Sequence, residues 1–315
     1  MRPIINDIIS AIPTMSHEER AVIIENLNSI DGYDKIIDVI ENHIESNHKC
    51  PHCGSNHLHK HGKSAGLQRY MCQSCKKTFN ALTNTPLAGM RKKELWIPYL
   101  QTMLDSKVLR KVNETININL KTAFYWRHKF SQLLHKDRPE VLVGIVEADE
   151  TYFRASCKGS KTLDNLPHKR GVSKGAKRGL SKDQVCVLVA TDRGHHFLEF
   201  ITGLGAINGN WLDKYFLNHI SIDSLLITDG HKSYVHFCNE NHITHKVVKN
   251  HRINTENNSY HIQNVNSYHS RIKNWIISVF HGVATKYLNH YLWWKHVLED
   301  KTIKDSITLF QVMIM

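Results

Sequence analysis

Two Cys-x-x-Cys pairs constrain the fold of this 315-residue chain more than any other feature. The pairs are separated by 18 residues, and their members are Cys50, Cys53, Cys72 and Cys75. This spacing is typical of zinc sites, in which two turns each present two thiolates to one tetrahedral Zn²⁺. The segment between the pairs suits a β-hairpin with Gly62 and Gly66 serving the turn. We therefore predict a zinc ribbon over residues 47–91.

Metal ribbons are often folding devices, in which the ion substitutes for a missing apolar core. That interpretation explains the four cysteines but not the basic side chains around them, which are Lys60, Lys63, Arg69, Lys76 and Lys77. A nearby histidine is an alternative fourth ligand, from the set His52, His57, His59 and His61. The remaining cysteines, Cys157, Cys186 and Cys238, are scattered and are predicted to be buried small apolar residues.

The charge of the chain is uneven and indicates a polyanionic partner. The formal net charge is +12, but residues 1–49 hold four Lys/Arg against nine Asp/Glu. This leader therefore carries −5 and the other 266 residues carry +17. A basic body favours nucleic acid as the partner, although a merely basic protein is the alternative. The sequence has no apolar run of membrane-spanning length and no signal peptide, so we expect a cytoplasmic protein.

Helical periodicity precedes and follows the cysteine pairs. Residues 1–46 are predicted to be a helical leader with Ser16 as an N-cap and a turn at "IDGYDK". Residues 92–138 predict helices beginning near Lys92, at Ser106 as an N-cap, and after Asn119 as an N-cap. Two helices joined by a short turn match a helix-turn-helix, and a plain helical linker is the alternative. The residues expected on or near its exposed, DNA-reading face are Lys121, Tyr125, Arg127, His128 and Lys129.

From Val141 the sequence becomes rich in β-strand patterns, and two of these runs end in a carboxylate. Asp149 follows "VLVGIVEA" and Asp229 follows "SLLIT". Two carboxylates on adjacent strands can bind Mg²⁺ or Mn²⁺ rigidly, as in-line attack at phosphorus requires. Taken singly, each aspartate is more typical of a strand-end cap or turn residue than of a metal ligand, so the hypothesis depends on the pair.

The segment after the β-rich region predicts a helix with one buried and one polar face. Its apolar stripe is Val265, Tyr268, Ile272, Trp275, Ile276 and Val279. Asn266, His269, Ser270 and Lys273 fall together on an adjoining face. Asn266 and Lys273 are seven residues apart, so their side chains point the same way.

These motifs together resemble an insertion-sequence transposase of the DDE superfamily, in the branch with an N-terminal zinc ribbon. The resemblance covers roughly residues 45–295 and includes "KTAFYWRHK", "EADETYF", "ITDGHKSY" and "VNSYHSRIKNWI". It implies an RNase H-like core with Asp149 and Asp229 as the first two catalytic acids. The third acid is expected near position 266, with Lys273 seven residues later. Here that position holds Asn266.

An Asp-Asp-Asn set with the same lysine occurs in one branch of the resembled group, which implies Asn266 as the third metal ligand. Asparagine gives one neutral oxygen and cannot act as a base, so an inactivated relic is the alternative. Glu147, Glu150 and Glu256 are alternative acidic ligands, and Glu147 is the closest because it lies on the same strand face as Asp149. The resemblance further implies metal-activated water that cuts the element ends and a freed 3′-hydroxyl that attacks target DNA. In that chemistry Lys273 binds phosphate, and Tyr152 and His261 help to position DNA.

The Lys/Arg-rich loop at 168–182 is expected to contact the DNA backbone, since phosphate binding needs charge more than geometry. The loop residues proposed for this role are Lys169, Arg170, Lys177 and Arg178. A solvated insertion without such a role is the alternative.

The predicted fold is multidomain α+β, with N-terminal helices, a zinc ribbon and a helix-turn-helix before an RNase H-like mixed α/β catalytic core. The expected parts are a leader (1–46), ribbon (47–91), helix-turn-helix (92–138), catalytic domain (139–300) and C-terminal tail (301–315). The expected function is a Mg²⁺-dependent DNA transposase with structural Zn²⁺, which acts on double-stranded element ends and target DNA as a homo-oligomer. The alternatives are a catalytically inactive DNA-binding regulator or domesticated relic, and a structure-specific nuclease.

Overall fold

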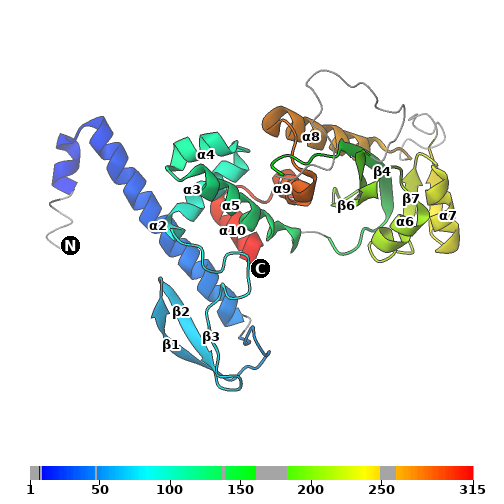
Figure 1. Cartoon of the computed structure of the whole chain (residues 1–315). Helices are drawn as coiled ribbons and strands as arrows, with labels where there is room; N and C mark the ends of the chain where they lie inside the picture. The colour runs from blue at the N-terminus through cyan, green and yellow to red at the C-terminus, as the bar shows by residue number, and fades with distance from the viewer. Residues whose placement is uncertain are drawn as a thin grey trace. The chain divides into compact units, whose positions relative to one another are not determined.

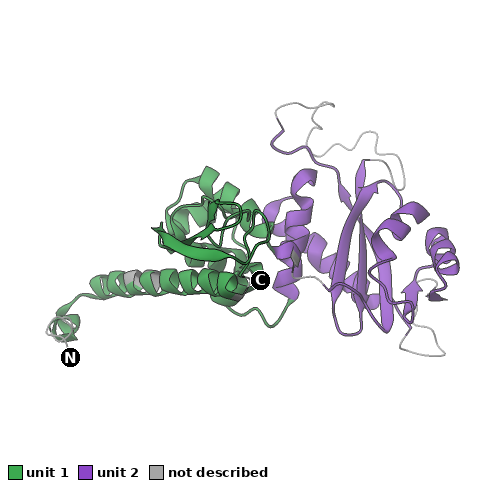
Figure 2. Ribbon diagram, turned by 90° about the horizontal axis from the view of Figure 1, so that it is seen from below, with its two compact units in different colours: residues 1–133, 300–315 green, residues 134–299 purple. Residues whose placement is uncertain are grey.

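The chain folds into two units, seen in a computed structural model that describes residues 7, 9–46, 48–136, 139–160, 183–248 and 260–314 (Figures 1 and 2). Residues 1–133 and 300–315 form the first unit, and residues 134–299 form the second. Helices and sheets occur together, so the prediction of a mixed α+β fold is confirmed. None of the described helices is long and apolar enough to cross a bilayer.

The first unit begins with a short 3₁₀ turn, η1 (Ile12–Thr14), and the long helix α2 (His17–Ser46). Ser16 caps α2 as predicted, because the Glu19 N–H donates to Ser16 Oγ at 3.2 Å and the Ser16 N–H donates to Glu19 Oε2 at 2.7 Å. This reciprocal pair is a capping box. The turn predicted at "IDGYDK" is wrong, since α2 continues through it. Ile97 packs over Gly32 there, and this tertiary contact outweighs the local preference for a turn.

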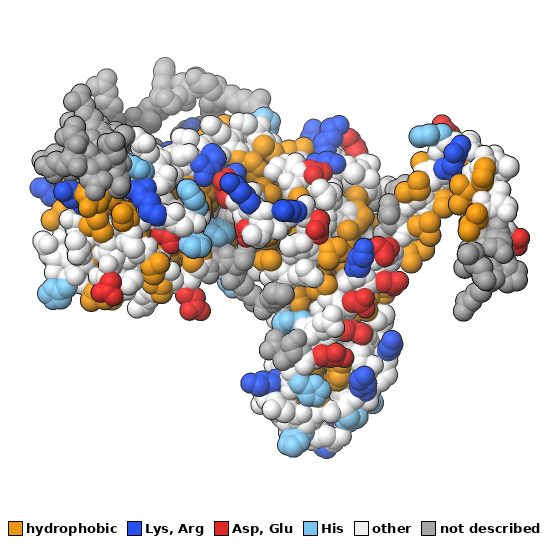
Figure 3. Space-filling model, turned by 180° about the vertical axis from the view of Figure 1, so that it is seen from behind, with side chains coloured by type: hydrophobic (Ala, Val, Ile, Leu, Met, Phe, Trp, Pro, Cys, Tyr) orange, Lys and Arg blue, Asp and Glu red, His pale blue; other side chains and the backbone are white. Residues whose placement is uncertain are grey.

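Helix α2 buries only its second half. Ile36, Ile40 and Ile44 are buried within the first unit. In the first half, Ile24, Leu27 and Ile30 are between 58 and 60% exposed. Figure 3 shows hydrophobic side chains, in orange, along the projecting part of the helix. The packing that holds α2 in the unit is therefore confined to its C-terminal turns.

A three-stranded antiparallel sheet follows α2. Its strands are β1 (Leu58–Ser64), β2 (Leu67–Cys72) and β3 (Thr78–Phe79), in the order β1-β2-β3. The hairpin turn uses Ala65 and Gly66, whose φ angles are 50° and 82°. Two positive φ angles are what a tight hairpin requires, and Gly66 serves the turn as predicted. Gly62 does not, because it lies in β1 where the pairing register shifts between Lys60 and Lys63.

Helices α3 (Trp96–Leu104), α4 (Leu109–Ile116) and α5 (Leu120–Ser131) come next, preceded by the 3₁₀ turn η2 (Lys93–Leu95). Asn119 caps α5 as predicted, because its side chain accepts the Lys121 N–H at 2.8 Å. The Ser106 cap is wrong, since α4 begins after Val108 and Ser106 lies in the connection with a φ of 54°. The Tyr99 ring of α3 stacks on Phe130 of α5, with centroids 5.5 Å apart, and fixes these two helices together.

The residues predicted as a C-terminal tail form a helix of the first unit, α10 (Ser306–Ile314). Phe310 is fully buried, and its ring lies 6.0 Å from that of Trp96. Ser306 Oγ donates to Gln101 Oε1 at 2.9 Å. The chain end therefore completes the apolar core around α3.

The second unit is built on a five-stranded sheet. Its strands are β4 (Ile145–Arg154), β5 (Gln184–Asp192), β6 (Phe197–Leu204), β7 (Leu225–Thr228) and β8 (Thr244–Val247). The strand order is β6-β5-β4-β7-β8. β4 pairs antiparallel with β5 and parallel with β7, so it lies at the centre of the sheet. The apolar runs that predicted strands in this region correspond to β4, β5, β6 and β7.

Helices cover both faces of this sheet (Figure 1). They are α6 (Gly209–Phe216), α7 (Lys232–Glu240), α8 (Gln263–Phe280) and α9 (Leu288–Glu299), with the 3₁₀ turns η3 (Leu134–Lys136) and η5 (Thr285–Tyr287). Val146 and Ala148 of β4 share a core with α6 and α7. Since side chains alternate along a strand, the odd-numbered residues of β4 point to the other face, where α8 packs.

We expect Phe310→Ala to destabilise the first unit by about 3–5 kcal/mol, because it removes a fully buried ring from the core. Urea denaturation of the full chain measures this as a lower midpoint for the first unit. Gln311→Ala, one residue later and exposed, is the matched control and should change stability by no more than about 0.5 kcal/mol. Equal stability of the Phe310→Ala and control proteins would contradict the assignment of α10 to this core.

Candidate active site and metal centre

The two predicted aspartates lie on neighbouring parallel strands. Asp149 is in β4, and Asp229 comes directly after β7. In the pairing of these strands Glu147 is opposite Ile227, a numbering difference of 80. Asp149 and Asp229 each lie two residues beyond this last pair, and the charges of both act on the carboxyl group of Glu150, so they lie near one another. The fold thus brings together two carboxylates that are far apart in the sequence.

One face of α8 turns toward Asp149. His269 Nδ1 lies 3.8 Å from Asp149 Oδ2. Burial, together with the charge of Lys273, lowers the pKa of His269 to about 3, so the imidazole is neutral at neutral pH. Asn266 and Lys273 are three residues before and four residues after His269, which places all three on one face of the helix. The polar stripe predicted from the sequence therefore lies on the face of α8 that meets the aspartates.

Glu150 adds a third carboxyl group close to the aspartates, from the opposite face of β4. Its pKa is raised to about 7, mainly by burial and also by the charges of Asp149 and Asp229, while the Tyr234 hydroxyl of α7 opposes the shift. At neutral pH this carboxyl is therefore only partly ionised. The electrostatic coupling shows that negative charge is concentrated where β4 and β7 meet.

Glu147, the closest alternative to Asp149, is already occupied by protein contacts. It is 1% exposed, accepts backbone N–H bonds from Asn264 and Val265, and pairs with Arg193. These contacts use both carboxylate oxygens and disfavour Glu147 as a metal ligand. Glu256, another predicted alternative acidic ligand, lies outside the described residues.

The donor atoms at this edge of the sheet fit a divalent cation. Asp149 and Asp229 could offer carboxylate oxygens, and Asn266 on helix α8 could offer an amide oxygen. The His231 N–H donates to Asp229 Oδ1 at 3.0 Å, which orients this carboxylate and leaves its second oxygen available. Hard oxygen donors suit Mg²⁺ or Mn²⁺ rather than softer metals.

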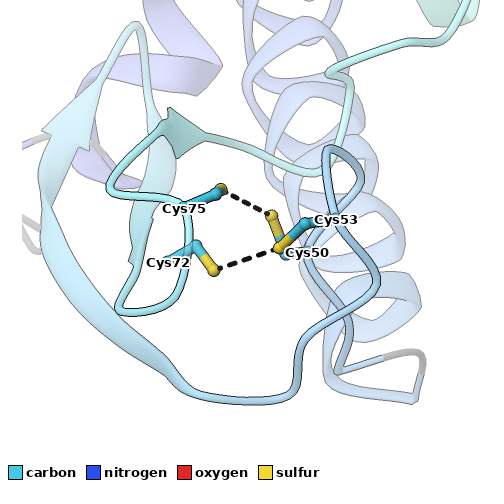
Figure 4. A group of neighbouring side chains, drawn as sticks. All are labelled: Cys50, Cys53, Cys72 and Cys75. Carbon is cyan, nitrogen blue, oxygen red and sulfur yellow. Dashed lines mark hydrogen bonds between the residues drawn. The ribbon is translucent and has the colours of Figure 1, made fainter.

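The four paired cysteines form a second candidate metal centre, in the first unit (Figure 4). Their sulfur atoms all lie within 4.8 Å of one another, with Cys50–Cys75 at 3.7 Å and Cys53–Cys72 at 3.6 Å. A tetrahedral ion with metal–sulfur bonds of about 2.3 Å requires sulfurs about 3.8 Å apart. The backbone N–H of Cys75 lowers the pKa of Cys72 to about 6, which favours the thiolate that a metal needs. This arrangement could hold zinc.

The cysteines outside this cluster do not all behave as predicted. Cys186 and Cys238 are buried, in agreement with their predicted role as small apolar residues. Cys157 is exposed, so the prediction of a buried position is wrong for it. Cys157 lies in the connection after β4, and residues there are not buried by the packing of the sheet.

The basic face predicted on α5 is smaller than expected. Lys121 and Tyr125 are exposed, and the Lys129 ammonium lies 4.9 Å from the centre of the Tyr125 ring. Arg127 is 1% exposed and donates to the Lys107 carbonyl at 2.6 Å, so it ties α5 to the α3–α4 connection. His128 is buried as well. The prediction of exposed positions is therefore wrong for Arg127 and His128, because both side chains lie on the buried face of α5.

Other predicted DNA contacts lie elsewhere than expected or cannot be located. Lys169, Arg170, Lys177 and Arg178 lie outside the described residues. Tyr152 packs against the core that β4 shares with α6 and α7, and its hydroxyl is buried. His261 lies beside Glu147, with its Nδ1 3.3 Å from Glu147 Oε1. Tyr152 and His261 thus make protein contacts, and their expected role in positioning DNA stays a prediction.

The contact of Arg193 with Glu147, and the hydrogen bonds of Glu147 to the start of α8, were not predicted from the sequence. Arg193 follows β5 in the turn "TDRGHH", where nothing in the local pattern distinguishes it from a solvated arginine. Its partner Glu147 is 46 positions earlier, and Asn264 is 117 positions after Glu147. Only the buried position of Glu147 within an apolar strand was a signal in the sequence that this carboxylate needed partners.

Comparison with known proteins shows what this arrangement is similar to. Residues 141–293, which contain all four predicted catalytic residues, match the family described as ISXO2-like transposase domain. A relative from Halobacterium salinarum, described as an uncharacterized protein in transposable element ISH50, is 28% identical over 248 residues. That alignment covers 77% of this chain and 82% of the relative.

The two matches support assignment to the insertion-sequence transposases of the DDE superfamily. The family implies DNA binding and a nuclease-type enzyme, and its members generally use divalent metals. The alignment with the ISH50 protein is longer than the segment 141–315, so the similarity extends into the first unit.

We expect Cys53→Ser to lose zinc, because it removes one of the four sulfurs of the cluster. Metal analysis of the purified full chain should find about one Zn²⁺ per molecule in the parent and a clear loss in the variant, with a lower unfolding temperature. Cys157→Ser is the matched control, since Cys157 is exposed and lies outside the cluster, and it should retain the metal. A parent protein purified without zinc, and equally stable with added chelator, would contradict the site.

Proposed function

We propose that the protein is a DNA transposase that binds the ends of its insertion element and catalyses metal-dependent strand cleavage and strand transfer. The observation that carries this proposal is the parallel pairing of β4 with β7, which brings Asp149 near Asp229 beneath the polar face of α8. The family match to residues 141–293 supports the same conclusion independently.

The proposed domains follow from the two units. We assign an RNase H-like catalytic domain to the second unit. The support is the strand order β6-β5-β4-β7-β8, which is 3-2-1-4-5 when the five strands are numbered along the chain. In the first unit we assign a zinc ribbon to β1–β3 with the four cysteines. The three-residue connection between α4 and α5, with Asn119 as the cap, supports a helix-turn-helix.

The proposed chemistry assigns one role to each residue. Asp149, Asp229 and Asn266 hold Mg²⁺ or Mn²⁺ with oxygen atoms from two strands and one helix. When bound, the metal activates the attacking water or 3′-hydroxyl and neutralises charge at the phosphorus. Lys273 binds the phosphate from the same helix face as Asn266. His269 is neutral and buried, and it fills the space between α8 and Asp149 without adding positive charge.

DNA binding would use the first unit and the loop 168–182. Lys121, Tyr125 and Lys129 provide two cations and an aromatic ring on one helix, a combination suited to phosphate and base contact. Positive charge carries most nucleic-acid affinity, and the chain beyond residue 49 carries +17. Two element ends must be held at once, which favours a homo-oligomer.

An inactive DNA-binding regulator derived from a transposase is the second candidate, and Asn266 is the observation that favours it. An amide at this position binds a metal more weakly than a carboxylate and provides no base. A structure-specific nuclease on the same core is a third candidate, in which cleavage would occur without strand transfer.

We expect Asp149→Ala and Asp229→Ala each to reduce strand cleavage and joining by about a hundredfold or more, since the metal contributes several kcal/mol to such reactions. The assay uses a labelled duplex that carries the terminal repeat flanking the gene, with Mg²⁺. Asp223→Ala, an exposed aspartate just before β7, is the control and should keep full activity. Unchanged activity in either active-site variant would refute the site, and cleavage without joining in the parent would favour the nuclease.

Asn266→Ala should lower the activity about tenfold or more, because it removes one metal ligand from the helix face. Asn266→Glu separates an evolved ligand from a decayed one, and we expect it not to exceed the parent in the same cleavage assay. Asn274→Ala, on the exposed side of α8, is the control. A glutamate variant that clearly outperformed the parent would favour the inactive relic.

A further inference from the structure

Helix α8 carries Asn266 and Lys273, but the side chain at its N-cap position does not cap it. Its N-cap residue is Ile262, which offers no side-chain hydrogen bond to the helix. The first N–H groups of any helix lack partners within the helix and need an acceptor. At the start of α8 the acceptor comes from the sheet, 117 residues earlier in the chain.

That acceptor is the carboxylate of Glu147, on the central strand β4. Its Oε2 accepts the N–H of Asn264 at 2.9 Å and the N–H of Val265 at 3.2 Å. Its Oε1 accepts the side-chain amide of Asn264 at 2.9 Å. A carboxylate at a helix N-terminus is favoured by the helix dipole as well as by the hydrogen bonds.

The Glu147 carboxylate is held in place by one cation, Arg193, and by the imidazole ring of His261. Arg193 Nη1 lies 2.5 Å from Oε1, and the His261 ring contacts the same oxygen at 3.3 Å. With 1% exposure, Glu147 has little contact with water, and a buried carboxylate without partners would be strongly destabilising. The partners therefore fix this side chain in one orientation.

This contact joins the two halves of the proposed metal site. Glu147 is two residues before Asp149 on the same face of β4, and the capped N–H groups of Asn264 and Val265 directly precede Asn266. We infer that Glu147 is a positioning residue that sets the distance between Asn266 on α8 and Asp149 on β4. The inference rests on the proposed function, because it assumes that these two residues share a metal ion.

A second buried carboxylate on the sheet provides a matched comparison. Glu199 of β6 is 2% exposed. Its Oε1 accepts the Tyr268 hydroxyl of α8 at 2.5 Å and lies 3.3 Å from His296 Nδ1 of α9. On α8 it contacts Tyr268, in the second turn of the helix and on the side away from the polar stripe. Loss of Glu199 should weaken the packing of α8 without moving its first turn.

The test compares Glu147→Gln with Glu199→Gln in the full chain, by Mn²⁺ binding and by thermal unfolding. We expect Glu147→Gln to weaken Mn²⁺ binding about tenfold or more, the effect typical of residues that orient metal ligands. Glu199→Gln should change the binding less than about twofold while lowering the unfolding temperature comparably. Hydrogen exchange at residues 264–266 should accelerate in Glu147→Gln and not in Glu199→Gln.

A double-mutant cycle identifies the route of the effect. In an Asn266→Ala background, Glu147→Gln should change Mn²⁺ affinity less than about twofold, because the ligand it positions is absent. The positioning role is overturned if the Glu147→Gln effect persists in that background, or if it does not exceed that of Glu199→Gln. Parent protein that binds no Mn²⁺, or that binds it equally after Asp149→Ala, would instead overturn the proposed metal site itself.

Discussion

The parallel pairing of β4 with β7 determines what the second unit can do. β4 lies at the centre of the sheet, and its register with β7 brings the carboxylates at positions 149 and 229 to one edge. A shift of one residue would turn every side chain of β4 to the opposite face. The apolar residues Val146 and Ala148, fixed in the core with α6 and α7, prevent such a shift and so hold Asp149 toward α8.

The sequence predicted β4, β5, β6 and β7 because each contains an apolar run of strand length, and it predicted the two aspartates because each one follows such a run, whereas β8 has no apolar run and was not predicted. It also predicted the Asn119 cap, which depends on residues two positions apart. Features decided by distant contacts were not predictable in this way. α2 passes through "IDGYDK" because Ile97 packs on Gly32, and Arg127 turns inward because the Lys107 carbonyl accepts its hydrogen bond.

The interpretation of residues 301–315 as a tail shows a different kind of failure. The segment "SITLFQVMI" has the apolar content of a buried helix, and it forms α10 in the core of the first unit. The segment was interpreted as a tail because it follows the predicted catalytic domain in the chain. Here the chain returns to the unit where it began, and only the burial of Phe310 beside Trp96 reveals this.

The charges around the aspartates give a physical reason for an amide at position 266. Asp149, Asp229 and Glu150 already interact electrostatically, and their mutual repulsion with burial raises the pKa of Glu150 to about 7. A glutamate at position 266 would bring a further negative charge to this edge of the sheet, next to the buried and neutral His269. An asparagine there supplies an oxygen to a cation without that repulsion. The acidic neighbourhood of β4 thus makes an uncharged oxygen donor at position 266 consistent with a working ligand.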